Sequence, residues 1–211
     1  MRIGLTGGIG TGKTYVANLI HRNFGIPVYN TDAEAKRLMK ESPEIREQLI
    51  SLLGTEAYLP TGQLNRDVMR RFVFSSEEHV KAVNAIVHPA VRRDFLRWAD
   101  VVTLTPEEAA LQQQFFKQQQ VVAVESALLV EAQLTEDVDS VLLVTASLQT
   151  RIRRTMQRDG LSEQDVLQRI THQLADADRM PFVHHIVTND DNTTDLPWQL
   201  QQFIMSLNIQ L

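Results

Sequence analysis

Short apolar runs alternate with longer segments of helical periodicity at both ends of the chain. A run of four or five residues with few polar positions is typical of a buried strand. Segments with this pattern cover residues 2–6, 26–29, 121–124, 141–144 and 185–188. Between most of them, apolar residues recur three or four positions apart, which predicts helices. Strands that alternate with helices predict an α/β fold with a five-stranded, parallel, doubly wound sheet.

Residues 42–120 lack the strand pattern and are helical throughout. Helix starts are marked by residue types that cap N-termini. The expected starts are Ser42-Pro43, Asn65, Ser75 with Glu78, and Thr105-Pro106. His88-Pro89 is expected to interrupt the third of these helices, because proline removes a backbone donor. The glutamine-rich end of the last helix, residues 112–120, predicts a solvated helix face.

A glycine-rich loop joins the first expected strand to the first expected helix. Its sequence, Gly7-Gly8-Ile9-Gly10-Thr11-Gly12-Lys13-Thr14, fits G-x-x-x-x-G-K-[ST] at every position. A strand before this motif and a helix after it are the context that a phosphate-binding loop requires. Glycines let consecutive backbone N–H groups surround an anion, and the helix N-terminus adds partial positive charge. The loop therefore predicts phosphate binding.

Two side chains of this loop complete a nucleoside triphosphate site. Lys13 can reach the β- and γ-phosphates, and the Thr14 hydroxyl can bind Mg²⁺. The main alternative is a dinucleotide-binding turn, which has an acidic residue about twenty positions on, as Asp32 is here. Lys13 excludes this alternative, because it occupies the position of the third glycine.

Two carboxylates lie where expected strands end, at the sheet edge that binds ligands in open α/β folds. Asp32 falls in the first turn of a helix, because Thr31 and Glu34 have capping-box spacing. It either accepts a proton from an attacking hydroxyl or complements the helix dipole, and its position alone favours neither role. Glu125 ends the third strand, where phosphate-loop proteins keep a carboxylate for the magnesium shell. The alternative for Glu125 is a salt-bridged strand terminus.

Arginines cluster after the fourth expected strand, over residues 151–160, and Ser162 opens a helix that carries Arg169 and Gln173. Such a run usually forms a solvated helix face. Here the net charge is negative and the run follows a strand of a phosphate-loop fold, which favours a mobile lid. Its guanidinium groups would stabilise charge on a phosphoryl group in transfer. Asn189 ends the last strand, where contact with the nucleotide base and loop capping are equally compatible with the sequence.

The composition limits the remaining classes of function. With 211 residues and 43% hydrophobic content, the chain can bury a sizeable core. A net charge of −5 argues against a nucleic-acid partner, and the absence of cysteine excludes disulfides and thiolate chemistry. The sequence has neither a leader pattern nor an apolar run of membrane-spanning length. We therefore expect a soluble, cytoplasmic protein without a membrane partner, as a monomer or small homo-oligomer.

The other sequence features that accompany the glycine loop indicate which class of phosphate-loop protein this is. A GTPase would need Asn-Lys-x-Asp, and Thr188-Asn189-Asp190-Asp191 lacks the lysine. A motor or helicase would usually have an apolar strand that ends in Asp-Glu, and the sequence contains none. A helical insertion combined with an arginine lid is instead the plan of a small-molecule kinase.

The motifs of one kinase family are matched by Gly4-Leu5-Thr6-Gly7-Gly8-Ile9-Gly10, Asn30-Thr31-Asp32, Gly62-Gln63-Leu64-Asn65-Arg66, His88-Pro89, Glu125-Ser126-Ala127-Leu128-Leu129-Val130-Glu131, and Arg154, Arg158 and Gln173. From Gly4 to about Asn189, the chain therefore resembles the dephospho-CoA kinase family. The departures from the family pattern are Tyr15 for a small residue, Glu125 for Asp, Ala127 for Pro and Arg151 for Gln.

The resemblance implies a P-loop kinase that uses ATP and Mg²⁺ to phosphorylate the ribose 3′-hydroxyl of dephospho-CoA, giving CoA and ADP. In this mechanism Asp32 is the base, Lys13 and Arg158 act on the phosphates, and Thr14 and Glu125 bind the metal. The residues expected to bind ATP are Gly8, Ile9, Gly10, Thr11, Gly12, Lys13, Thr14, Tyr15, Arg154 and Asn189. Those expected to bind the acceptor are Arg66, His88 and Pro89.

The expected organisation is a single kinase domain over residues 1–211. Its nucleotide-binding core covers about 1–40, 120–146 and 182–211, the helical CoA-binding insertion about 41–119, and the lid about 147–181. Two other functions stay open: a nucleoside or nucleotide kinase with another acceptor, and an ATPase switch that acts on a protein partner.

Overall fold

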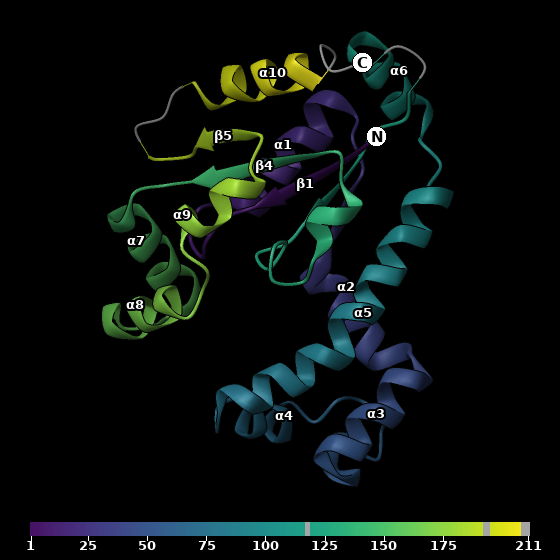
Figure 1. The fold of residues 1–211 in the computed structure, drawn as a ribbon, viewed down its shortest axis with the longest axis vertical. Coiled ribbons are helices and arrows are strands. Elements are labelled where there is room, and N and C mark those ends of the chain that lie inside the picture. The colour runs from purple at the N-terminus through teal and green to yellow at the C-terminus, as the bar shows by residue number, and fades with distance from the viewer. Residues whose placement is uncertain (117–118, 192–194, 208–211) are drawn as a thin grey trace. The chain divides into compact units, whose positions relative to one another are not determined.

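The computed structural model describes residues 1–116, 119–191 and 195–207. Five parallel strands form one sheet in the order β2-β3-β1-β4-β5 (Figure 1). Their bounds are β1 Arg2–Thr6, β2 Val28–Asn30, β3 Val122–Glu125, β4 Ser140–Thr145 and β5 His185–Thr188. The predicted α/β fold with a five-stranded parallel sheet is confirmed.

The described helices connect these strands. The α-helices are α1 Lys13–Phe24, α2 Thr31–Glu41, α3 Pro43–Leu53, α4 Arg66–Val73, α5 Glu77–Val101, α6 Pro106–Phe115, α7 Leu148–Asp159, α8 Glu163–Thr171, α9 Asp176–Arg179 and α10 Leu196–Leu207. Single turns of 3₁₀-helix cover Thr55–Ala57, Leu134–Asp137 and Met180–Phe182. Within the described ranges, no helix is both long enough and apolar enough to cross a bilayer.

The main core lies between one face of the sheet and the helices α1 and α10. Alternate residues of β1, Ile3 and Leu5, point into it, as the period of a strand requires. Val16 and Ile20 of α1 enter it from the helix side, at the spacing that places them on one face. This packing fixes α1 against β1, and so fixes both ends of the loop that joins them.

The chain divides into two compact units, Met1–Tyr29 with Val101–Leu211 and Asn30–Asp100. The first unit contains nearly all of the sheet, α1 and α6 to α10. The second contains α2, α3, α4 and nearly all of α5. The second unit thus begins and ends earlier in the chain than the expected insertion, and α6 packs against α1 in the first unit.

Two predicted helix caps are wrong by one residue. Asn30, not Thr31, caps α2: its side chain accepts a hydrogen bond from the Ala33 N–H at 2.8 Å. Ser76, not Ser75, accepts from the His79 N–H at 3.2 Å at the start of α5. An N-cap residue has non-helical backbone angles, as Asn30 does, and capping spacing alone does not distinguish neighbouring cap-forming residues. Asp32 lies in the first turn of α2, as predicted.

The predicted interruption at His88-Pro89 is wrong, because α5 continues through Pro89 to Val101. The buried residues Val83, Val87, Val91 and Phe95 lie four positions apart, on one face of the helix. Burying this continuous face offsets the cost of an internal proline, about 3 kcal/mol. The helix bends near its middle (Figure 1), which is expected where proline removes a hydrogen bond.

The prediction that residues 112–120 form a solvated helix face is wrong for Gln112. Gln112 is buried, and its amide group donates to the carbonyls of Gly25 and Val121 at 2.9 and 2.8 Å. It also accepts from the Val121 N–H at 2.9 Å. The buried amide therefore joins the end of α1 to the start of β3. Its hydrogen bonds to these backbone groups replace the water contacts that it loses on burial. Residues 117 and 118 of the glutamine-rich stretch lie outside the described residues.

Candidate active site

The glycine loop between β1 and α1 has a backbone conformation that requires glycine, as Gly10 and Gly12 show. Gly10 and Gly12 have φ angles of 79° and 86°, in the left-handed region. A Cβ atom at Gly10 would lie 2.4 Å from the carbonyl oxygen of Arg151. A Cβ atom at Gly12 would lie 2.2 Å from Nδ2, the side-chain amide nitrogen of Asn189. The loop is therefore packed closely against α7 and the end of β5.

Lys13 and the start of α1 give the loop its positive charge. The Nζ atom of Lys13 donates to the carbonyl of Gly8 at 3.2 Å, so the ammonium group folds back over the loop. The first turn of α1 contains no acidic residue that would neutralise the positive end of the helix. The buried Thr11 hydroxyl also donates to the Gly8 carbonyl, at 2.9 Å, and holds the loop's curvature. The arrangement suits a bound phosphate chain.

Thr14 and Glu125, predicted separately as metal ligands, lie together. The Thr14 hydroxyl donates to Oε1 of Glu125 at 2.6 Å, and Glu125 is buried at the end of β3. A hydroxyl and a carboxylate are the hard oxygen ligands that Mg²⁺ prefers. Among the described residues, no group of three or more His, Cys, Asp or Glu forms a metal cluster. Mg²⁺ in kinases needs no such cluster, because substrate phosphates and waters supply its other ligands, so these two residues fit the ion.

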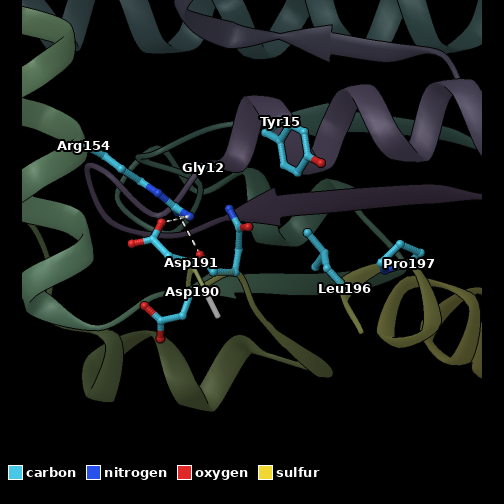
Figure 2. Close-up of a pocket in the computed structure, with 8 residues that line it drawn as sticks. Gly12, Tyr15, Arg154, Asp190, Asp191, Leu196 and Pro197 are labelled. Carbon is cyan, nitrogen blue, oxygen red and sulfur yellow. Dashed lines mark hydrogen bonds and ion pairs between the residues drawn. The ribbon is translucent and has the colours of Figure 1, made fainter. Parts of the chain in front are cut away.

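Asn189 and Arg154 meet at the other side of the loop. The Asn189 side chain donates to the carbonyl of Thr11 at 2.8 Å. Arg154 donates to the backbone carbonyl of Asn189 at 2.7 Å and to Asp191 at 3.0 Å (Figure 2). Asn189 therefore joins the loop to β5, and Arg154 of α7 is held beside it.

A cavity of about 610 Å³ lies next to these residues (Figure 2). Its lining residues are Gly12, Tyr15, Arg154, Asn189, Asp190, Asp191, Leu196 and Pro197. Tyr15, Leu196 and Pro197 provide apolar surface, which suits the flat face of a nucleotide base. Sequence reasoning missed Asp190, Asp191, Leu196 and Pro197 as parts of this site, because only the fold brings the start of α10 to α1.

The two carboxylates of the cavity are engaged by neighbouring groups. Asp190 accepts from the backbone N–H and the hydroxyl of Ser147, and these hydrogen bonds hold the pKa of Asp190 below its usual value. Asp191 forms ion pairs with Arg153 and Arg154. These contacts fix the segment after β5 to the start of α7.

Arg158 lies in a surface ion pair. Its guanidinium donates to both carboxylate oxygens of Asp159, at 2.7 and 3.0 Å, and its side chain is 61% exposed. This hydrogen bonding raises the pKa of Arg158 and lowers the pKa of Asp159. Arg169 also reaches Asp159, at 3.4 Å. The two predicted lid helices, α7 and α8, are thus joined at this pair, and Arg158 makes no described hydrogen bond to the loop.

Gln173 and Arg151 bind the same loop residue, Ile9. The Ile9 N–H donates to the side-chain oxygen of Gln173 at 2.7 Å, and Nε of Arg151 donates to the Ile9 carbonyl at 3.0 Å. Sequence reasoning placed Gln173 in the lid and noted Arg151 only as a departure from the family pattern. These residues are 164 and 142 positions from Ile9, so no local signal reports the contacts.

The four remaining predicted residues lie in the second unit. Asp32 is exposed in the first turn of α2, and Arg66 is exposed at the start of α4. His88 is half-buried and Pro89 is exposed, as consecutive residues of α5. Their roles in acceptor binding and proton transfer stay predictions.

Comparison with known proteins points to one family. A family model described as dephospho-CoA kinase matches residues 1–195. The chain is 32% identical to the dephospho-CoA kinase of Bacteroides fragilis over 201 residues, which cover 95% of this chain and 90% of that one. A crystal structure of TT1252 from Thermus thermophilus is similar with a TM-score of 0.74 at 31% identity, covering 100% and 97% of the two chains.

The fold is also shared with more distant kinases. The structure of dephospho-CoA kinase from Campylobacter jejuni has a TM-score of 0.66 at 20% identity, covering 99% and 98% of the two chains. At this identity the similarity concerns the fold alone.

Proposed function

The chain belongs to the dephospho-CoA kinase family, and we propose that the residues described above carry out that family's reaction. The protein is a transferase that phosphorylates dephospho-CoA with ATP, as a step of coenzyme A biosynthesis. The observation that carries the assignment is the complete phosphate loop, residues 7–14, within a family match over residues 1–195. The proposal extends to the roles of individual residues.

The chemical step is a direct transfer. The ribose 3′-hydroxyl oxygen of the acceptor attacks the γ-phosphorus of ATP, and the bond from that phosphorus to the β,γ-bridging oxygen breaks. The hydroxyl proton passes to the carboxylate of Asp32, and ADP leaves. An exposed carboxylate in the first turn of α2 is accessible to a substrate hydroxyl, which supports this role.

The nucleotide is held by the loop and its neighbours. The backbone of residues 8–12, Lys13 and Thr14 bind the phosphates, while Tyr15, Arg154 and Asn189 surround the base and ribose. The cavity beside Gly12 has the apolar walls that a base needs. Thr14 and Glu125 would hold Mg²⁺, which neutralises charge on the phosphates when it is bound with ATP.

The acceptor is assigned to the second unit. Arg66 and His88, with Pro89 beside it, supply cationic and polar groups for the phosphates and ribose of dephospho-CoA. Exposure of Arg66 and partial exposure of His88 support this assignment. A cytoplasmic location, where ATP is available, and a monomer or small homo-oligomer complete the proposal.

Arg158→Ala is expected to lower kcat about 10²-fold with little change in the KM for ATP. The reason is that Arg158 is paired with Asp159 here and must leave that pair to reach a transferring phosphoryl group. A group that acts only in the transition state changes kcat more than binding. Steady-state kinetics with varied ATP measure this. A raised KM at unchanged kcat would make Arg158 a ground-state phosphate clamp instead.

ATP consumption with different acceptors tests the proposed function. We expect the purified protein to form ADP rapidly with dephospho-CoA, and slowly with a nucleoside, with a nucleotide, or without an acceptor. Rapid turnover with a nucleoside or nucleotide alone would indicate a kinase with another acceptor. ATP hydrolysis that is independent of any acceptor would indicate an ATPase switch.

A further inference from the structure

Arg151 is placed on the phosphate loop itself. Its Nε atom donates to the Ile9 carbonyl at 3.0 Å. Its Nη2 atom lies 2.2 Å from the position that a Cβ atom on Gly8 would occupy, so the guanidinium rests directly against the Gly8 backbone. The hydrogen bond to Ile9 uses Nε, so the two Nη nitrogens are not required to hold the side chain in place.

Two cationic groups therefore converge on one residue of the loop. Lys13 reaches the Gly8 carbonyl at 3.2 Å, and the Arg151 guanidinium lies against the Gly8 α-carbon. Positive groups gathered at the glycine loop attract the terminal phosphate of a nucleoside triphosphate, where negative charge is greatest. Burial lowers the pKa of Arg151, yet a guanidinium stays protonated at neutral pH, so the loop keeps both charges.

A buried ionic group lies behind Arg151. Arg179 is fully buried, with Nη1 2.8 Å from Asp176 and Nη2 3.9 Å from Glu131. Asp176 in turn acts electrostatically on Arg151. Arg179 acts on Arg151 in the opposite sense, because it is a second cation. The position of Arg151 on the loop therefore rests on its contacts with Ile9 and Gly8.

Arg158, the lid arginine that the family motif identifies, has no comparable position. It is paired with Asp159, and its side chain is 61% exposed. Arg151 thus contacts the phosphate loop in this structure, while Arg158 contacts a neighbouring carboxylate.

We propose that Arg151 is a further catalytic residue, which contacts the γ-phosphoryl group of ATP through its Nη nitrogens and stabilises negative charge during transfer. This inference rests on the proposed function for its chemistry. The inference explains why arginine rather than the family's glutamine at position 151 would matter. Glutamine can donate a hydrogen bond to the loop but cannot supply positive charge. A loop-supporting role alone would need the hydrogen bond to Ile9 and not the charge.

The test compares Arg151→Gln, which can keep a donor, with Arg151→Lys, which keeps the charge. Arg151→Gln is expected to lower kcat about 10²-fold, and Arg151→Lys to recover most of that loss. Calorimetric titration is expected to show about tenfold weaker binding of a non-hydrolysable ATP analogue to Arg151→Gln, with ADP binding unchanged, because ADP lacks the γ-phosphate. Arg22→Gln, an exposed arginine of α1, is the matched control and is expected to match wild type.

Two results would overturn the inference. One is wild-type kcat in folded Arg151→Gln. The other is an equal loss in both variants, with ADP and ATP-analogue binding weakened in parallel, because that pattern indicates a loop support. If Arg151→Gln does not fold, Arg151→Met, which keeps the aliphatic stem, takes its place in the same comparison. The nucleotide titrations need no acceptor, so they decide the role of Arg151 even if wild type fails to phosphorylate dephospho-CoA.

Discussion

Lys13→Ala is expected to lower kcat by at least about 10³-fold while the protein stays folded. The Lys13 ammonium lies over the loop on the Gly8 carbonyl, and it supplies a full charge where phosphate charge develops. Its side chain is only partly buried at the start of α1, so its removal costs little packing. Steady-state kinetics with ATP and dephospho-CoA measure the loss, and thermal unfolding verifies the fold.

Lys81→Ala is the control for this experiment, because Lys81 is an exposed lysine of α5 with no assigned role. It is expected to keep wild-type kcat. A folded Lys13→Ala protein with unchanged kcat would contradict the assignment of the glycine loop as the site of phosphoryl transfer. If the melting temperature of Lys13→Ala falls together with its kcat, the lost activity is caused by unfolding and not by the missing ammonium group.

Asp32→Asn is expected to lower kcat by about 10²–10⁴-fold, the usual contribution of a general base. Asparagine keeps the shape of the side chain but does not accept the hydroxyl proton. ATP binding and melting temperature are expected to stay near wild type, because a carboxylate in a first helical turn contributes only about 0.3–1 kcal/mol to stability. Kinetics, calorimetric ATP titration and thermal unfolding separate the catalytic role from the helix-dipole role.

The chain offers a closely matched control for Asp32. Asp67 is the second residue of α4, after the N-cap Asn65, as Asp32 is the second residue of α2, after the N-cap Asn30. Both carboxylates are exposed. Asp67→Asn is expected to change stability as Asp32→Asn does and to leave kcat unchanged. If Asp32→Asn keeps its turnover, the base is another carboxylate or is not needed, which the loose transition state of phosphoryl transfer permits.

The parts of the site that the sequence predicted are those with local signals. The loop between β1 and α1 is one continuous motif, and its glycines and lysine are adjacent in the chain. Thr14 and Glu125 were each predicted as metal ligands, from their places in the loop motif and at a strand's carboxyl end, and the structure brings them within hydrogen-bond distance. Strand and helix positions were largely predictable for the same reason, since hydrophobic periodicity is local.

The parts that the sequence did not predict depend on contacts between distant segments. Arg179 lies in a charged stretch that is typical of an exposed helix, yet it is fully buried. Gln112 and Pro89 follow local rules for a solvated face and a helix break, and tertiary burial overrides both. Arg151 is one of several similar arginines of α7, and its contacts with Gly8 and Ile9 distinguish it.

Identification of the product tests the central claim most directly. The protein is incubated with ATP and dephospho-CoA, the Lys13→Ala protein prepared in the same way serves as the control for contaminating kinases, and phosphorus NMR with mass spectrometry identifies the products. The account predicts equimolar ADP and CoA, with the new phosphate on the ribose 3′-hydroxyl, and almost none from the variant. ADP without phosphorylated dephospho-CoA, or equal product from the Lys13→Ala protein, would contradict it.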